Sequence, residues 1–234
     1  MKEAAHPMTE SSSRSPSRGD ARRAAILDAA LALLAEEGYD NLSTRAVSAR
    51  AKASKETLYA HFGDRRGLLA ALVLQEAEAT NTALRQALTQ AADAAAVGPV
   101  RPVLVEALTG LVTLLTSSRS VAINRVAIAA LPADPEPAEI LAARGRRTTG
   151  PLFEALLRRG VQNGELVLDD PATAFEVLYG LAIRDSQIGA LLGRAPAWTD
   201  DDRRARADHA VALFYRLYGA SGTRPSRAQG HAGG

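Results

Sequence analysis

Apolar residues recur at helical spacing along most of the chain. The first such segment extends from Asp20 to Glu37, where positions three or four apart form one apolar stripe: Ile26, Ala30, Leu33 and Leu34. This periodicity predicts an amphipathic helix, which Asp20 would cap at its N-terminus and Gly38 would end. The same spacing predicts further helices at about 65–92, 101–116, 119–131, 137–147, 148–162, 171–192 and 201–218.

Two short helices fit between the first and second of these long segments. Ser43 can cap the first short helix and Ser54 the second, and only a short turn separates them. Their inward-facing residues would be Ala46, Val47, Ala51, Leu58 and Phe62. Apolar faces that meet across so short a turn require a steep crossing, which is the layout of a helix-turn-helix.

Composition favours an all-α fold. Aromatic residues make up 4% of the chain, β-branched residues are sparse, and neither repeats nor strand-type alternation occur. Helix-breaking segments at Gly98-Pro99, 131–137 and Asn163-Gly164 separate the predicted helices. The two ends, 1–19 and 220–234, have no apolar period, so we expect both to be disordered.

Composition also excludes several classes of protein. The chain has no cysteine, which excludes disulfides, a zinc–cysteine site and a thiol nucleophile. No apolar run approaches the roughly 20 residues that a membrane span needs, and the N-terminus lacks the apolar region of a secretory signal. These features predict a cytoplasmic protein without a membrane segment.

The net charge of +2 is small, but basic residues gather in one segment. Between residues 43 and 70, Glu56 and Asp64 are the acidic residues, against six basic ones: Arg45, Arg50, Lys52, Lys55, Arg65 and Arg66. A local basic segment on an otherwise neutral chain is typical of a polyanion site. A chance cluster on a solvated helix face would look the same, and charge alone leaves both interpretations open.

The second short helix carries side chains suited to reading a nucleic acid. Its outward positions all offer hydrogen-bonding groups: Lys55, Glu56, Thr57, Tyr59 and His61. The major groove of DNA presents a distinct pattern of donors and acceptors at each base pair, which such side chains can match.

Residues 22–70 resemble the N-terminal domain of the TetR (tetracycline-repressor-type) family of transcriptional regulators. The matching segments are ILDAALALLAEEGYDNLSTRAVSARA and SKETLYAHFGDRRGLL, and FYRLYG at 214–219 is similar to the final helix of many members. The resemblance implies a three-helix DNA-binding domain at 20–66 and a larger helical ligand-binding and dimerisation domain at 67–219. It also implies a ligand-responsive repressor that binds a pseudo-palindromic operator in double-stranded DNA as a homodimer.

The turn between the two short helices departs from the family pattern. Members usually have glycine there, whereas this chain reads Ala51-Lys52-Ala53-Ser54. A lysine in the left-handed conformation costs about 1 kcal/mol. Either the chain bears this cost, or the turn is reshaped, or Lys52 gains a contact with a DNA phosphate.

By position, the resemblance implies a role for each exposed residue of the motif. Lys55, Glu56 and Tyr59 would face base edges. The phosphate contacts would come from Thr44, Arg45, Thr57, Tyr59, His61 and Arg65. Two of these residues also have a plainer interpretation, Arg65 as the solvated start of a helix and His61 as a packed or capping histidine.

The resemblance further implies a small-molecule effector among the helices of 101–192. The candidate ligand contacts are polar or aromatic residues within apolar runs: Asn124, Arg125, Phe153, Phe175, Tyr179 and Arg184. An internal ion pair or a dimer contact would explain each polar one as well. The segments 171–192 and 201–218 would form a four-helix bundle with their copies in a two-fold dimer.

Two other classes of protein compete with a DNA-binding regulator: an enzyme, and a helical structural or interaction protein. The sequence lacks the Gly-x-Ser-x-Gly, phosphate-loop and dinucleotide motifs, and its histidines have no metal-ligand spacing. We therefore expect no enzyme activity, no cofactor and no metal. A helical structural or interaction protein remains the alternative, with 171–192 and 201–218 as simple core.

Overall fold

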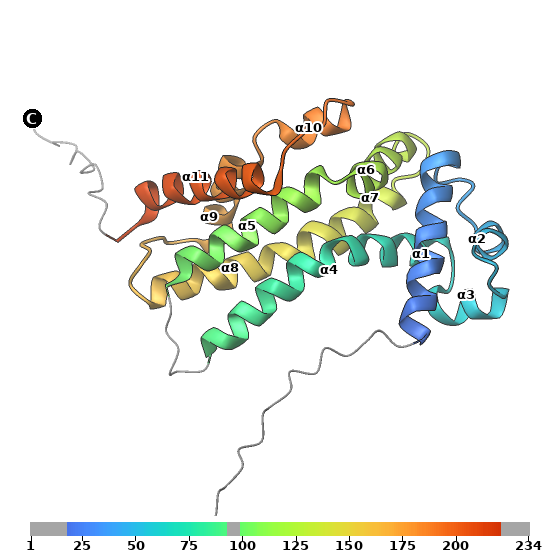
Figure 1. Cartoon of the computed structure of the whole chain (residues 1–234), viewed down its shortest axis with the longest axis horizontal. Helices are drawn as coiled ribbons and strands as arrows, with labels where there is room; N and C mark the ends of the chain where they lie inside the picture. The colour runs from blue at the N-terminus through green and yellow to red at the C-terminus, as the bar shows by residue number, and fades with distance from the viewer. Residues whose placement is uncertain (1–17, 93–98, 221–234) are drawn as a thin grey trace, which may run out of the picture.

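The structure, a computed structural model, describes residues 18–92 and 99–220. Within these ranges it is helical apart from one isolated antiparallel bridge between Leu166 and Gly219, so the all-α prediction is confirmed (Figure 1). The helices are α1 (Arg18–Glu37), α2 (Thr44–Ala51), α3 (Lys55–Phe62), α4 (Arg65–Ala92), α5 (Val100–Thr116), α6 (Ser118–Ala130), α7 (Glu136–Leu141), the π-helical turn η1 (Ala142–Arg146), α8 (Arg147–Gln162), α9 (Pro171–Ile183), α10 (Ser186–Leu191) and α11 (Asp200–Tyr218). The predicted disordered ends lie outside the described residues except for Arg18, Gly19 and Ala220, which are placed.

The predicted helices of the first 92 residues are all present. α1 begins at Arg18, so Asp20 lies in its first turn rather than at its cap. Gly38 ends α1 as expected: its φ is +81°, and its amide donates to the Leu34 carbonyl at 3.1 Å. A residue with a Cβ would be strained in this left-handed conformation, which explains the glycine.

The single helix predicted at 171–192 is wrong. The chain breaks at Arg184, whose φ of 48° and ψ of −125° end α9, and a separate short helix α10 follows. At this break the Arg206 guanidinium donates to the carbonyls of Ala182 at 2.5 Å and Ile183 at 3.1 Å, which a continued helix would pair with its own amides. Neither glycine nor proline marks this break, so the apolar period runs through it unchanged.

The predicted boundary between helices at 147 and 148 is also wrong. α7 continues through the wide turn η1 into α8, so 136–162 form one helical segment with a π-type widening. Single π turns of this kind are frequent at functional sites. Here the widening brings Gly145 and Arg146 to the wall of the cavity described below.

Two buried clusters lie along α4, which runs from the helix-turn-helix end of the molecule into the bundle (Figure 1). The first holds α1 to α4 together and also includes Ile123 of α6 and Ile140 of α7. The second joins the later part of α4 to α5, α8, α9 and α11, around Phe153 and Phe214. α1 and α4 therefore lie between the two short helices, α2 and α3, and the helices α6 and α7.

Across the two described ranges, no single helix is both long and apolar enough to span a membrane. α5 and α6 pass that test together, by length and composition, as a pair bent by 56°.

Candidate nucleic-acid interface and ligand cavity

Two serine caps fix the starts of α2 and α3, which we call the reading helices. Ser43 accepts a hydrogen bond from the Ala46 amide at 3.1 Å, and Ser54 accepts one from the Thr57 amide at 3.1 Å. Each cap satisfies an amide that a helix start would otherwise leave unpaired. Leu58, completely buried, then holds α3 against the core, which leaves the opposite face of α3 outward.

The turn between α2 and α3 is left-handed at Lys52. Its φ is 49° and its ψ is 43°, and the Ala53 amide closes the turn on the Ser48 carbonyl at 3.0 Å. The turn is therefore not reshaped. Arg22 of α1 donates to the Lys52 carbonyl at 2.6 Å, which holds the strained residue in place. Whether Lys52 also contacts a phosphate stays a prediction.

The outward face of α3 is exposed as predicted from the pattern. Lys55, Glu56, Tyr59 and His61 all face solvent, and Tyr59 is 60% exposed although it is aromatic. Thr57 is half-buried, with its hydroxyl 3.0 Å from that of Ser54. The pKa of Glu56 is lowered by hydrogen bonds from its own amide and from Ser54, so its carboxylate is ionised and acts only as an acceptor.

On α2, Arg45 is exposed and Thr44 is half-buried beside the Ser43 cap. Both therefore lie at the start of the first reading helix. α2 and α3 form one end of the molecule in Figure 1, away from α9 and α11.

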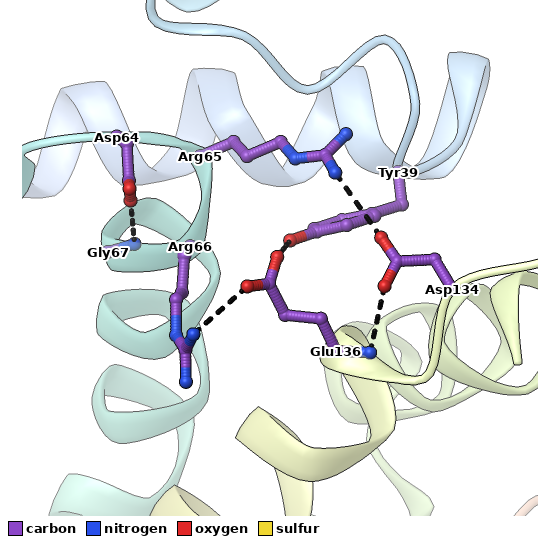
Figure 2. A network of polar contacts seen from close by, with 7 residues as sticks. All are labelled: Tyr39, Asp64, Arg65, Arg66, Gly67, Asp134 and Glu136. Carbon is purple, nitrogen blue, oxygen red and sulfur yellow. Dashed lines mark hydrogen bonds and ion pairs between the residues drawn. The ribbon is translucent and has the colours of Figure 1, made fainter.

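Arg65 begins α4 in a polar network rather than in open solvent (Figure 2). Its guanidinium lies 3.3 Å from an oxygen of Asp134 in the α6–α7 loop and 4.6 Å from the centre of the Tyr39 ring. Arg65 is thus a partly solvated helix start, with its side chain 41% exposed, that is also held by Asp134 and Tyr39. Any phosphate that Arg65 binds has to share this guanidinium with Asp134.

The same network continues through Glu136, the first residue of α7. Glu136 accepts a hydrogen bond from the Tyr39 hydroxyl at 2.7 Å and pairs with Arg66 at 3.1 Å (Figure 2). Its own amide donates to Asp134 at 3.0 Å. Burial and the neighbouring Glu136 carboxylate raise the pKa of Tyr39 well above its usual value, so its hydroxyl remains a donor. We call Tyr39, Arg65, Arg66, Asp134 and Glu136 the α4–loop network.

Sequence reasoning missed this network, apart from Arg65. Its partners are 69 to 97 residues apart in the chain, and no local pattern relates them. Two acidic residues in a proline-rich loop opposite two arginines at a helix start were the only signal.

A cavity of about 340 Å³ lies in the helical body. Its wall is mostly apolar and comes from α4, α5, α6, α7, η1, α8, α9 and α10, with residues that include Val73, Leu111, Leu115, Ile123, Leu131 and Leu141. Among the predicted ligand contacts, Asn124, Phe175 and Tyr179 line it.

The other three predicted ligand contacts lie elsewhere. Phe153 is completely buried and stacks on Phe175 at 4.9 Å, behind the wall. Arg125 donates to the carbonyls of Leu191 and Ala190 at the end of α10, at 2.9 and 3.1 Å. Arg184 lies at the strained break after α9.

The polar groups of the cavity wall are already paired. The Tyr179 hydroxyl donates to Gln187 at 2.9 Å, and the Asn124 amide donates to the Ser120 carbonyl at 2.8 Å. Arg146 lies over the Tyr179 ring at 5.3 Å, and Glu76 accepts from Arg119 at 2.6 Å. Sequence reasoning missed Glu76 and Arg146 because charged residues on amphipathic helices ordinarily face solvent.

In the part of the chain that the structure describes, no group of three or more His, Cys, Asp or Glu side chains is placed to hold a metal ion. The described residues present an outward polar helix at one end and a mostly apolar cavity in the helical body, an arrangement suited to recognition. A helix-turn-helix joined by one long helix to a cavity-bearing helical body defines a DNA-binding regulator with an effector domain.

Sequence comparison identifies the family. Residues 26–72 match the model described as "Bacterial regulatory proteins, tetR family", and residues 102–220 match "AefR-like transcriptional repressor, C-terminal domain". The chain belongs to the TetR family and is a transcriptional repressor, not an enzyme. No curated protein matches its sequence.

Solved structures agree with this assignment. A TetR transcriptional regulator from Agrobacterium tumefaciens is 35% identical, with 89% of this chain and 97% of that chain covered and a TM-score of 0.65. A TetR-family regulator from Mesorhizobium loti is 22% identical, with 87% and 100% covered and a TM-score of 0.69. SmeT, the repressor of a Stenotrophomonas maltophilia multidrug efflux pump, solved with triclosan, is 22% identical, with 86% and 93% covered and a TM-score of 0.62. The last two show the fold alone.

Proposed function

We propose that this repressor binds a pseudo-palindromic operator as a homodimer, with α3 of each protomer in the major groove. The observation that carries the proposal is the outward face of α3. Lys55, Glu56 and Tyr59 are exposed there, while Leu58 and Phe62 hold the helix on the core. A packed helix that presents donors and acceptors on its free side suits direct readout of base pairs.

Base reading and phosphate binding are divided among residues of α2, of α3 and of the start of α4. Lys55 donates to guanine O6 and N7, and the ionised Glu56 accepts from cytosine N4. The phosphate contacts come from Thr44, Arg45, Thr57, Tyr59, His61 and Arg65. Arg65 adds one constraint, because its guanidinium must leave Asp134 or bridge it to the phosphate.

The proposed dimer interface comprises 171–192, which holds α9 and α10, and 201–218 of α11. α11 buries Phe214 in its own protomer and leaves Leu217 61% exposed on another side. Ile188 and Leu192, at α10, are also exposed apolar residues. A two-fold axis through these helices brings identical apolar faces together. The two α3 helices would then lie about one turn of DNA apart, roughly 34–36 Å.

An effector in the cavity is proposed to weaken operator binding. A cavity of about 340 Å³ with a mostly apolar wall lies at the lower end of the usual size range for small-molecule sites. The complex of SmeT with triclosan supports a small, largely apolar ligand by analogy. We keep 20–66 as the DNA-binding domain and 67–219 as the effector and dimerisation domain. The protein would act in the cytoplasm, where a bacterial operator is found.

Selection of bound duplexes from a random DNA pool by the full-length protein tests the proposal. We expect an inverted repeat with half-sites about one helical turn apart, bound more tightly than competitor DNA. If no duplex is bound more tightly than competitor DNA, the result would favour the alternative, a helical interaction protein.

A further inference from the structure

One arginine links the cavity wall to the DNA-binding end of the molecule. Glu76 of α4 lines the cavity, and its side chain is only 14% exposed. Arg119 of α6 donates from Nε to Glu76 at 2.6 Å and from Nη1 to Asp28 at 2.9 Å. Asp28 belongs to α1, the helix against which the reading helices pack. These three residues, which we call the Asp28–Arg119–Glu76 relay, connect α1, α6 and α4.

The relay has a spare donor. Arg119 Nη2 is buried and has no hydrogen-bond partner within the described ranges. A buried unpaired donor is costly, and such groups call for an explanation. Although burial opposes its charge, the hydrogen bonds with Glu76 and Asp28 raise the pKa of Arg119, so the guanidinium stays charged. It can therefore exchange partners without losing its proton.

Two charged residues of the described ranges line the cavity, Glu76 and Arg146. Arg146 pairs with Glu176 at 3.3 Å and lies over the Tyr179 ring. Glu76 shares the Arg119 guanidinium with Asp28, so one positive charge serves two carboxylates, of which only Glu76 lines the cavity. A cationic group on an apolar ligand would give the Glu76 carboxylate a second partner, whereas that carboxylate would repel an anion.

We propose that Glu76 binds a cationic group of the effector, and that Arg119 transmits this contact to Asp28 on α1. This inference rests on the proposed function and names the class of its ligand and the route of its signal. When the effector takes the Glu76 carboxylate, Arg119 turns its free Nη2 to Asp28 and binds that carboxylate with two nitrogens. A bidentate pair fixes geometry more strictly than a single bond, so α1 moves relative to α6.

Three probes that share one apolar chain test the ligand class: n-decylamine, 1-decanol and n-decanoate. Isothermal titration of the full-length protein should show decylamine binding about tenfold or more tightly than decanol, because the ammonium group pairs with the Glu76 carboxylate by charge as well as by hydrogen bond, whereas the hydroxyl of decanol offers a hydrogen bond alone. In Glu76→Gln this preference should fall close to one. Glu78→Gln, which removes an exposed carboxylate of α4 that pairs with Arg85 outside the cavity wall, is the matched control and should keep it.

Asp28→Asn separates the relay from the cavity. This variant should bind decylamine within about twofold of the wild-type affinity, because Asp28 does not line the cavity. Release of the selected operator by decylamine, which we expect to be at least about fivefold in the wild type, should fall towards one. Thermal melting monitored by circular dichroism checks that each variant is folded. If Glu76→Gln does not fold, operator release by decylamine in Asp28→Asn still tests the proposal.

The proposal is overturned if decanoate binds more tightly than decylamine, if decylamine does not bind, or if Asp28→Asn releases operator like the wild type. Probe binding is measured without DNA. A protein that selects no operator but prefers decylamine would therefore refute the proposed function while supporting Glu76 as the ligand contact.

Discussion

Two non-glycine residues in the described ranges have a positive φ, Lys52 and Arg184. Each lies at the end of a helix, and each has an arginine bound to a nearby carbonyl: Arg22 at Lys52 itself, and Arg206 at the two residues before Arg184. Backbone strain of this kind persists where surrounding contacts hold it. At Lys52, the strain falls in the turn that sets the angle between α2 and α3.

The first prediction concerns the charge of Lys52. Lys52→Gly removes a left-handed cost of roughly 1 kcal/mol, but glycine adds freedom to the unfolded chain worth roughly 0.5–1 kcal/mol. The free energy of unfolding should therefore change by less than about 0.5 kcal/mol. If the exposed Lys52 ammonium contacts a phosphate, the salt dependence of DNA binding should become shallower by about one unit per protomer.

Lys52→Asn controls for backbone freedom, because asparagine tolerates the left-handed region and is uncharged. Affinity measured against salt should match that of Lys52→Gly. An unchanged slope in both variants would show that Lys52 contributes only to the turn.

At the scale of elements, local sequence signals predicted the helix-turn-helix well. Ser43, Ser54 and Gly38 act through neighbours a few residues away, so their spacing alone indicates the helix ends. At the break at Arg184, Arg206 binds the Ile183 carbonyl from 23 residues later in the chain, and periodicity gives no sign of such a contact.

The sequence predicted only some of the residues that line the cavity, because others are brought to it by contacts between distant segments. Asn124 is a polar residue within an apolar run, and Phe175 and Tyr179 are aromatic residues within one. All three line the cavity, as predicted. Glu76 lies on a helix whose charged residues mostly face solvent, and only packing of α4 against α6 shows which way it points. The α4–loop network likewise depends on contacts between distant segments.

The second prediction concerns the Arg65–Asp134 pair. Asp134→Asn keeps the shape of the side chain but removes the charge that competes with a DNA phosphate. Operator affinity should rise, by up to about 1 kcal/mol per protomer, because the pair is partly exposed. Affinity by fluorescence anisotropy, with Arg65→Ala in a double-mutant cycle, measures this coupling. Weaker binding by a folded Asp134→Asn would mean that Asp134 positions Arg65 for the phosphate.

The third prediction concerns the dimer. Phe214 is completely buried in its own protomer, so a charge there would damage the fold rather than the interface. Leu217→Glu places a charge on the exposed side of α11 and should shift the protein to monomer in sedimentation. Val161→Glu, at an exposed residue of α8 outside both the proposed interface and the cavity wall, is the control and should remain dimeric. A dimeric Leu217→Glu would exclude this face.

At the scale of the whole molecule, α4 takes part in both buried clusters. Asp134 of the α6–α7 loop and Glu136 at the start of α7 lie between cavity residues on both sides, Leu131 before them and Ala138 after them. A ligand that shifts this loop changes the contacts at the start of α4, directly behind α3. The cavity and the reading helix are thus parts of one packed unit.

The fourth prediction follows from this arrangement. Any effector that weakens operator binding must itself be weakened by operator, by the same factor, typically 5–150-fold. A thermal-shift screen of small molecules, followed by titration of each hit with and without the selected duplex, measures both sides of this cycle. Equal affinity in the two titrations would mark a hit as a bystander.

The central claim is that α3 reads bases while neighbouring residues hold phosphates. Affinity against salt for the wild type and Lys55→Ala, on the selected operator and on a scrambled duplex, tests it most directly. We predict that Lys55→Ala loses about 1–3 kcal/mol on the operator, retains its affinity for scrambled DNA much better, and flattens preference at one or two base pairs per half-site. An equal loss on both duplexes, with a shallower salt slope and unchanged base preference, would contradict the placement of α3 in the groove.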